Sequence, residues 1–330
     1  MKTTPTSPLH TISTTASGLP RSEQNQSQVD TTRQVRAVGE RALVLGGGGS
    51  TGNAWLIGVI AGLFDAGLDV TTADLTIGTS AGSTAAAQLA GATPTDLLAA
   101  ILAAAPRQGP GAAGSGRGHV PIRPVSDHLE RIGKIIAAAE DAADMRRRMG
   151  ASALAMDAAS DGSWQTQWRA TVASRLPSQR WPQRKVLITA VDARTGEPAV
   201  FDRHSGVDLA DAVAASCASG LPYGIGDNRY IDGGYRRNEN ADLAGGYGRV
   251  LVLSPFGGRA LQPVGWGMQL SAQVDELRAL GCRVETIFPD SSSKHLFGEN
   301  AMDLSLRPPA ARAGYEQGIA LTEQLAEFWR

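Results

Sequence analysis

Two glycine-flanked segments near the start of the chain carry residue types that can perform acyl transfer. The apolar run 42–45 ends in the glycines 46–49, and the run 75–77 turns directly into Gly78-Thr79-Ser80-Ala81-Gly82. In a Gly-x-Ser-x-Gly elbow the serine lies on a sharp turn from strand to helix, so its hydroxyl projects into solvent. Backbone N–H groups of the upstream glycine loop can then stabilise an oxyanion beside that hydroxyl. The two segments therefore predict a nucleophile, Ser80, next to an oxyanion hole.

A serine nucleophile needs a general base, and two kinds of residue compete for that role. The chain contains five histidines: His10, His119, His128, His204 and His295. His295 would fit the chain order serine, acid, histidine of α/β-hydrolases, but those folds have further strands before the elbow, where this chain has one helix. Asp232 is the preferred base because it ends a short strand and the following Gly233-Gly234 lets another backbone approach closely. Burial beside the serine would raise the pKa of its carboxyl toward the working pH. The alternative is an Asp-Gly turn in a hairpin.

The glycine loop also matches a second, unrelated kind of site. Gly47-x-Gly49-x-x-Gly52 follows a strand and opens a helix, as the dinucleotide-binding fingerprint does. That fingerprint needs an acidic residue at the end of the second strand, about twenty residues further on, to hold the ribose. Asp69 and Asp74 lie near that distance, but both precede the strand 75–77. An oxyanion hole is therefore preferred, and an NAD(P)-binding domain of Rossmann type is the alternative.

The elements that position these residues alternate between strand and helix. Further strands are expected at 185–191, 199–201, 229–231, 250–253 and 283–288, and helices at 53–66, 81–90, 95–105, 209–219, 266–280 and 309–330. Two or three amphipathic helices are expected within 125–175. This alternation favours an α/β fold with a mostly parallel sheet and helices on both faces.

Composition divides the chain into a tail and a folded part. Residues 1–38 are rich in Ser, Thr, Gln and Pro, and such a segment cannot offset its ordering entropy by burial, so a disordered tail is expected. Residues 39–330 are expected to form one domain, in which about 106–180 is a helical cap or insertion over one end of the sheet. Trp164 and Trp168, four residues apart, are expected to pack within this cap rather than to anchor the protein in a membrane.

Charge and cysteine usage narrow the classes of partner and compartment. The chain has 330 residues, 42% of them hydrophobic, and its net charge of -1 gives no global attraction to nucleic acid or anionic lipid. Cys217 and Cys282 are too few for a disulfide framework and fit a reducing, cytoplasmic compartment. Neither a membrane-spanning run nor a secretory signal is evident. The basic run Arg146-Arg147-Arg148 leaves peripheral contact with a membrane surface open.

Three short signatures, in this order, resemble the patatin-like phospholipase family. They are Gly47-Gly48-Gly49-Ser50-Thr51-Gly52, Gly78-Thr79-Ser80-Ala81-Gly82 and Asp232-Gly233-Gly234. The resemblance implies a three-layer α/β fold with a helical cap. It also implies a Ser–Asp dyad, with Ser80 as nucleophile and Asp232 as general base, and an oxyanion hole made by the amides of Gly47, Gly48 and Gly49. The implied activity is hydrolysis of lipid or lysophospholipid esters, with no metal or organic cofactor and no nucleic-acid partner.

One position departs from the family pattern. Many members carry Arg or Lys where this chain has Thr51, and loss of that charge weakens the expectation of phosphate-bearing substrates more than that of simple esters. A patatin-like pseudoenzyme or interaction module, with an intact but unused dyad, is a further alternative. The sequence leaves the head group, the acyl-chain preference and the oligomeric state open.

Overall fold

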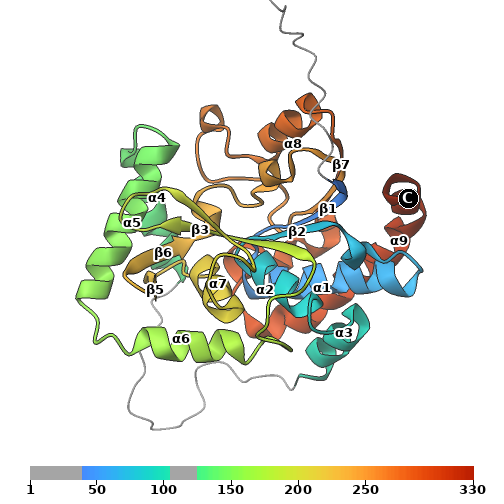
Figure 1. Cartoon of the computed structure of the whole chain (residues 1–330), viewed down its shortest axis with the longest axis horizontal. Coiled ribbons are helices and arrows are strands. Elements are labelled where there is room, and N and C mark those ends of the chain that lie inside the picture. Colours follow the sequence, from blue (N-terminus) through green and yellow to red (C-terminus); the bar gives the residue numbers. More distant parts are fainter. Residues whose placement is uncertain (1–38, 105–124) are drawn as a thin grey trace, which may run out of the picture. The chain divides into compact units, whose positions relative to one another are not determined.

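A computed structural model describes residues 39–104 and 125–330 of the chain (Figure 1). The tail expected at 1–38 and the first part of the expected cap, 106–124, lie outside the described residues. His10 and His119 lie outside them as well.

One sheet of eight strands runs through the described part of the chain, in the order β5-β6-β3-β2-β1-β7-β8, with β4 paired to β3. The strands that run parallel to one another are β1 (Gly39–Leu45), β2 (Leu75–Gly78), β3 (Lys185–Asp192), β7 (Tyr247–Leu253) and β8 (Arg283–Ile287). The antiparallel pairings involve β4 (Pro198–Phe201), β5 (Tyr223–Ile225) and β6 (Asn228–Asp232). The prediction of a mostly parallel sheet is confirmed.

Successive side chains of β1 face two different cores, because side chains alternate between the faces of a sheet. Leu43 and Leu45 belong to the larger core. The helices on that side are α1 (Gly49–Asp65), α2 (Ala81–Leu89), α3 (Pro94–Ala103), α7 (Leu209–Ser216) and α9 (Arg307–Trp329). Ala42 and Val44 belong to the second core, which is covered by α8 (Leu270–Ala279) and the short turn Ala241–Ala244. The three-layer α/β fold expected from the sequence is confirmed.

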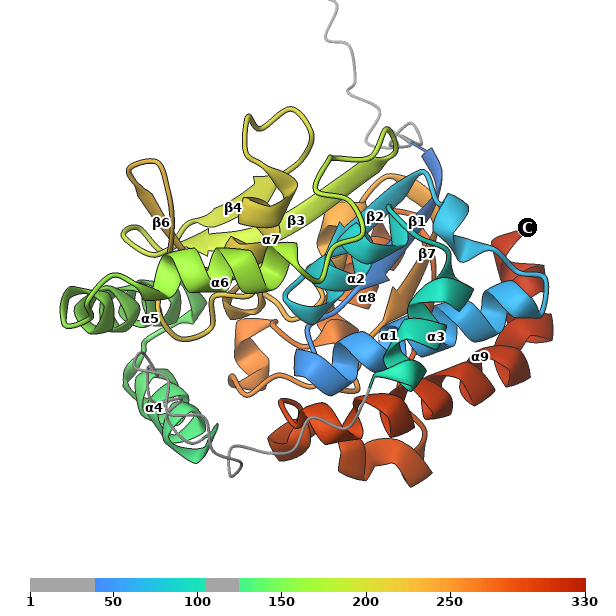
Figure 2. The same cartoon turned by 90° about the horizontal axis from the view of Figure 1, so that it is seen from below.

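Helices α1 and α9 lie side by side (Figure 2) and approach each other through glycines. A Cβ on Gly58 of α1 would overlap the backbone of Ala311, and a Cβ on Gly318 of α9 would overlap the backbone of Val59. Residue numbers rise together along the contact, so the two helices are parallel. Their N-terminal ends therefore lie next to each other.

Three helices of the described part of the chain lie between α3 and β3. They are α4 (Val125–Ala138), α5 (Ala142–Ala158) and α6 (Trp164–Ala173), which lie at the end of the sheet that carries β5 and β6 (Figure 1). Trp164 and Trp168 are stacked, with ring centroids 6.1 Å apart, and pack against the larger core. Trp168 Nε1 also donates a hydrogen bond of 3.0 Å to the carbonyl oxygen of Ala214. The ring stacking lies within the insertion, and the other contacts join the insertion to α7 and the larger core.

The helix expected at 266–280 begins only at Leu270, so this prediction was wrong at its N-terminal end. Val264–Trp266 is a single 3-10 turn, and Gly267 then has a φ of 63°, which ends the turn in the left-handed region. Gln269 is extended and precedes the first helical residue. Among the described helices, none combines the length and the apolar character needed to cross a membrane.

Candidate active site

Ser80 lies at the turn between β2 and α2 with a strained backbone. Its φ is 51° and its ψ is −114°, and among the described non-glycine residues only Asn240 also has a positive φ. The flanking glycines are required by close approach: a Cβ on Gly78 would lie 2.6 Å from Ser83 Cα, and one on Gly82 would overlap the carbonyl of Leu45. Strain of this kind persists where the surrounding structure enforces it, often at functional sites. The turn thus has the form of a nucleophile elbow.

The register of the sheet brings Ser80 and Asp232 to the same height. Gly78 is level with Ile188 of β3, and Ala190, two residues further along β3, pairs with Asp232 of the antiparallel β6. Ser80 is likewise two residues beyond Gly78. At this edge the Ser80 Oγ donates a hydrogen bond of 2.7 Å to Asp232 Oδ2. The two residues singled out in the sequence are therefore in direct contact.

The carboxyl group of Asp232 is almost fully enclosed. The residue is 7% exposed, and its Oδ1 accepts a hydrogen bond of 2.8 Å from the Gly234 N–H. Burial raises the pKa of Asp232 to about 6, while the hydrogen bonds from Gly234 and Ser80 act in the opposite direction. The carboxylate is therefore ionised at neutral pH yet poorly solvated, which is the state required of a general base.

The end of α7 holds the backbone of the elbow. The Ser80 N–H donates a hydrogen bond of 2.9 Å to Ser216 Oγ. The Ser80 carbonyl oxygen accepts hydrogen bonds from Ser83 Oγ at 2.6 Å and from Cys217 Sγ at 3.2 Å. Burial, together with the nearby Asp232, raises the pKa of the Cys217 thiol to about 11, so it is a neutral donor here. Neither the contact of Ser216 with the elbow nor that of Cys217 was predicted from the sequence.

The glycine loop offers fewer free amides than the sequence suggested. The Gly47 N–H already donates a hydrogen bond of 3.0 Å to the carbonyl oxygen of Asn238, so this amide is occupied. Within the described residues, the N–H groups of Gly48 and Gly49 have no such acceptor. A Cβ on Gly48 would lie 2.5 Å from Pro255 Cβ, and Gly49 has a φ of 65°. The expected three donors are reduced to two, Gly48 and Gly49.

A buried network of polar side chains is hydrogen-bonded to the glycine loop at Gly47. Asn238 Nδ2 donates to the Gly47 carbonyl oxygen at 3.2 Å and to Glu239 Oε1 at 2.9 Å. Glu239 is 1% exposed and accepts further hydrogen bonds from Ser254 Oγ at 2.7 Å and Gln273 Nε2 at 3.3 Å. Burial raises the pKa of the Glu239 carboxyl. Sequence reasoning missed this network, although the polar residues directly after the Asp-Gly-Gly turn were a usable signal.

Asn240 connects the two halves of the site. Its Nδ2 donates to Thr79 Oγ1 at 3.0 Å, to Thr189 Oγ1 at 3.2 Å and to the carbonyl oxygen of Gly233 at 3.2 Å. Thr79 precedes Ser80 and Gly233 follows Asp232, so one side chain connects the neighbours of both predicted site residues to Thr189 of β3.

The competing candidates from the sequence lie elsewhere. Within residues 39–104 and 125–330, no histidine side chain is hydrogen-bonded to Ser80 or Asp232, and His295 is exposed, with its Nδ1 beside the Ser292 carbonyl. Asp74 accepts hydrogen bonds from the backbone N–H groups of Glu40 and Arg41 at the start of β1. It therefore lies at the edge of the sheet opposite the glycine loop, where it cannot hold a ribose bound to that loop.

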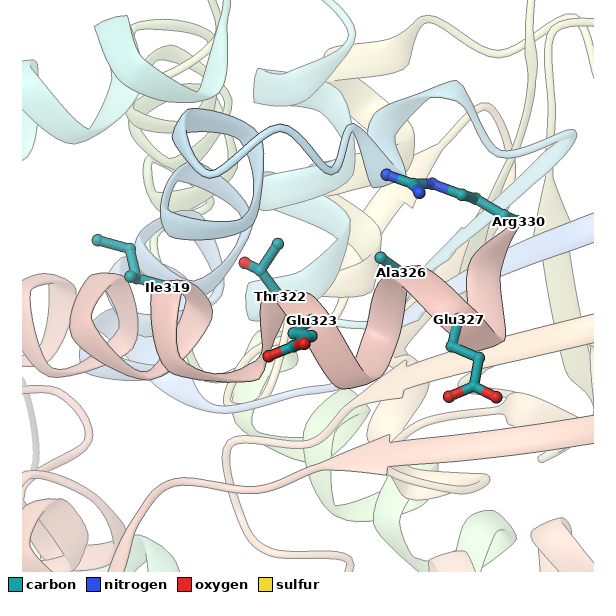
Figure 3. A pocket seen from close by; sticks show the side chains of 6 residues that line it. All are labelled: Ile319, Thr322, Glu323, Ala326, Glu327 and Arg330. Carbon is teal, nitrogen blue, oxygen red and sulfur yellow. The ribbon is translucent and has the colours of Figure 1, made fainter.

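A separate surface pocket lies along the second half of α9. Figure 3 shows the side chains that line it: Ile319, Thr322, Glu323, Ala326, Glu327 and Arg330. Ile319 is twelve residues beyond Arg307, or about 18 Å along the helix axis. The pocket thus lies away from the start of α9 and contains neither member of the dyad.

The strained Ser80 turn and the buried Asp232 thus lie together at one edge of an α/β sheet. The family model described as patatin-like phospholipase matches residues 43–244, which include the glycine loop, the elbow and Asp232. The chain therefore belongs to the patatin-like phospholipase family. A comparison with curated proteins gives no match.

Two solved structures show distant likeness to the chain. VipD from Legionella pneumophila is 14% identical with a TM-score of 0.39, and the comparison covers 86% of this chain and 67% of VipD. The type III effector protein ExoU is 17% identical with a TM-score of 0.31, and the comparison covers 85% of this chain and 53% of ExoU. The family assignment rests on the sequence match, not on these two structures.

Proposed function

We propose that the protein is a serine acyl-hydrolase that cleaves lipid or lysophospholipid esters through a Ser80–Asp232 dyad. The observation that carries this proposal is the 2.7 Å hydrogen bond between a strained serine hydroxyl and a buried carboxylate in a member of this family. Family membership supports lipid esters as the substrate class.

In the proposed reaction the Ser80 hydroxyl attacks the ester carbonyl while Asp232 takes its proton. The N–H groups of Gly48 and Gly49 stabilise the negative charge that develops on the carbonyl oxygen. Asp232 then passes its proton to the leaving alcohol, and the acyl group stays on Ser80. Water, deprotonated by Asp232, hydrolyses this acyl-enzyme and restores the dyad.

Turnover of p-nitrophenyl esters by matched variants tests the proposal. Ser80→Ala should abolish turnover because it removes the nucleophilic hydroxyl. The fold should stay intact because Ser80 belongs to neither hydrophobic core. Asp232→Asn keeps the shape but removes the proton acceptor, so the rate should fall by roughly 10² or more. His295→Ala is the control and should be nearly silent. Activity in Ser80→Ala, or loss of activity in His295→Ala alone, would contradict the assignment.

Two alternatives make different predictions. An NAD(P)-binding domain should bind nucleotide in calorimetry, yet Asp74 lies at the wrong edge of the sheet for a ribose contact. A pseudoenzyme should retain the Ser80–Asp232 hydrogen bond but hydrolyse no ester in a broad substrate screen.

We also propose that the carboxyl edge of the sheet contacts a lipid surface. Two loops flank the glycine loop: the loop after β7 packs Pro255 against Gly48, and the loop after β8 accepts a hydrogen bond of 3.0 Å from Thr51 at the Ala301 carbonyl. Beyond these contacts the loops expose large apolar side chains.

These side chains form what we call the apolar rim: Val264 at 81% exposure, Leu261 at 68% and Met302 at 59%. Exposed large apolar side chains can mark a surface that binds a partner, and these three lie on the two loops that contact the glycine loop. Since the proposed substrate is a lipid ester, we infer that the rim enters the boundary between head groups and acyl chains.

A further inference from the structure

Arg307, the first residue of α9, touches the helix that begins at the glycine loop. Its Nη1 donates to the carbonyl oxygen of Ser50 at 2.8 Å and to Ser50 Oγ at 3.2 Å, and its Nη2 donates to Asn53 Oδ1 at 3.2 Å. Asn53 Nδ2 in turn donates to the carbonyl oxygen of Ala81, next to Ser80, at 3.4 Å. The guanidinium therefore contacts Ser50, which directly follows the glycine loop, and is linked through the Asn53 side chain to Ala81 in the elbow.

The charge of Arg307 is poorly compensated at this position. Among the described residues no carboxylate lies within ion-pair distance of Arg307. The nearby charge that acts on it is the cation of Arg175, which repels it. Burial and Arg175 lower the pKa of Arg307 to about 10, so it stays charged at neutral pH.

The helix ends around Arg307 add to this positive charge. The start of a helix carries a partial positive charge, and the starts of α1 and α9 lie side by side. Neither helix has an acidic residue in its first turn. A cation near helix N-termini is disfavoured electrostatically, and negative charge that develops nearby would stabilise it.

We propose that Arg307 is a positioning residue for the oxyanion hole. Through Ser50 and Asn53 it fixes the first turn of α1, so that the Gly48 and Gly49 amides stay directed at the reacting carbonyl. Its charge also stabilises the oxyanion once that forms. This inference rests on the hydrolase function proposed above.

Three variants of the full chain separate this role from a structural one. Arg307→Gln removes the charge, Arg307→Lys keeps it, and Arg312→Gln is the control, because Arg312 is an exposed arginine of the same helix. In Arg307→Gln we expect kcat to fall roughly 10- to 100-fold with KM nearly unchanged, as for an interaction made mainly in the transition state. The unfolding temperature should be equal to or above that of the wild type. Arg307→Lys should recover part of kcat, and Arg312→Gln should match the wild type.

Chemical rescue gives an independent readout. Arg307→Ala should regain part of its kcat when guanidinium ion is added at non-denaturing concentration, whereas Arg312→Ala should show no gain. An unchanged kcat in Arg307→Gln would overturn the inference. So would a loss of kcat that accompanies a lowered unfolding temperature and is not rescued. If wild-type protein itself neither turns over esters nor reacts at Ser80, the proposed function fails instead.

Discussion

Asp232 has to remain charged in a setting that disfavours charge. Its carboxylate is 7% exposed and accepts two hydrogen bonds, from the Gly234 N–H and the Ser80 hydroxyl, and among the described residues it forms no ion pair. The raised pKa that results is useful for proton transfer, because a base works best when its pKa lies near the operating pH.

The rate should depend on the ionised form of Asp232. Because burial raises the pKa of Asp232 to about 6, kcat/KM should rise with pH through that region and level off above it. Measurements of kcat/KM on a neutral ester from pH 4.5 to 8.5, with the fold monitored by circular dichroism, check this. A rate that stays constant down to pH 4.5 in folded protein would exclude Asp232 as the base.

Ionisation of the buried Asp232 carboxyl should lower the free energy of unfolding at high pH. The ordinary pKa of 3.8 applies in the unfolded chain, and the folded value is about 6. Asp232 therefore favours the folded state most when it is protonated, below 3.8, and that contribution is lost as pH rises through 6. Asp232→Asn should unfold at a temperature roughly 2–5 °C above that of the wild type at pH 8, with little difference at pH 4. A variant that is less stable than wild type at pH 8 would contradict the burial cost.

At the scale of the elements, loop and elbow depend on backbone contacts that only glycine permits. In Gly48→Ala the new Cβ would lie 2.5 Å from Pro255 Cβ, so the loop must move and its amides turn away from the carbonyl. Ester turnover should fall by roughly 10² to 10³, as for loss of an oxyanion donor. Gly133→Ala, on α4, is the matched control, since nothing lies within 4 Å of its added Cβ. Equal turnover in both variants would place the oxyanion hole elsewhere.

The local sequence was sufficient to predict the strands that end at the glycine loop and at Ser80. The apolar runs before the glycine loop and before Ser80 are short and stop at glycines, so both strands and the presence of a helix after each were predictable, although α1 begins at Gly49 and not at residue 53. The helix start at Leu270 was not, because Val264–Trp266 adopts a 3-10 turn whose apolar residues mimic a helical pattern. Likewise, no local pattern reveals that the Gly47 amide is taken by Asn238, since that bond joins residues far apart in the chain.

At the scale of the whole molecule, contacts between distant segments build the site. Ser80 and Asp232 are 152 residues apart and meet through the shared register of β2, β3 and β6. Arg307 reaches Ser50 across 257 residues because α1 and α9 are parallel. The residues of the predicted dyad could be named from the sequence, but the contacts of Ser216, Asn240 and Glu239 with the site appear only in the fold.

The apolar rim should decide whether the protein works at a lipid surface. The double variant Leu261→Asp, Val264→Asp should lose binding to phosphatidylcholine vesicles and most turnover of aggregated substrate, but retain turnover of a water-soluble ester. Leu280→Asp is the control: Leu280 is 50% exposed but precedes β8, at the opposite edge of the sheet. Sedimentation with vesicles and parallel assays on the two substrates check this. Equal vesicle binding by the double variant and the wild type would show that the apolar rim does not bind the lipid surface.

The central claim is that Ser80 is a nucleophile activated by Asp232. It is tested most directly by treating the protein with a fluorophosphonate and locating the adduct by peptide mass spectrometry. We expect a single phosphonyl adduct on Ser80 in the wild type, much slower labelling in Asp232→Asn and none in Ser80→Ala. An unlabelled wild-type protein, or an adduct on another residue with Ser80 unmodified, would contradict it.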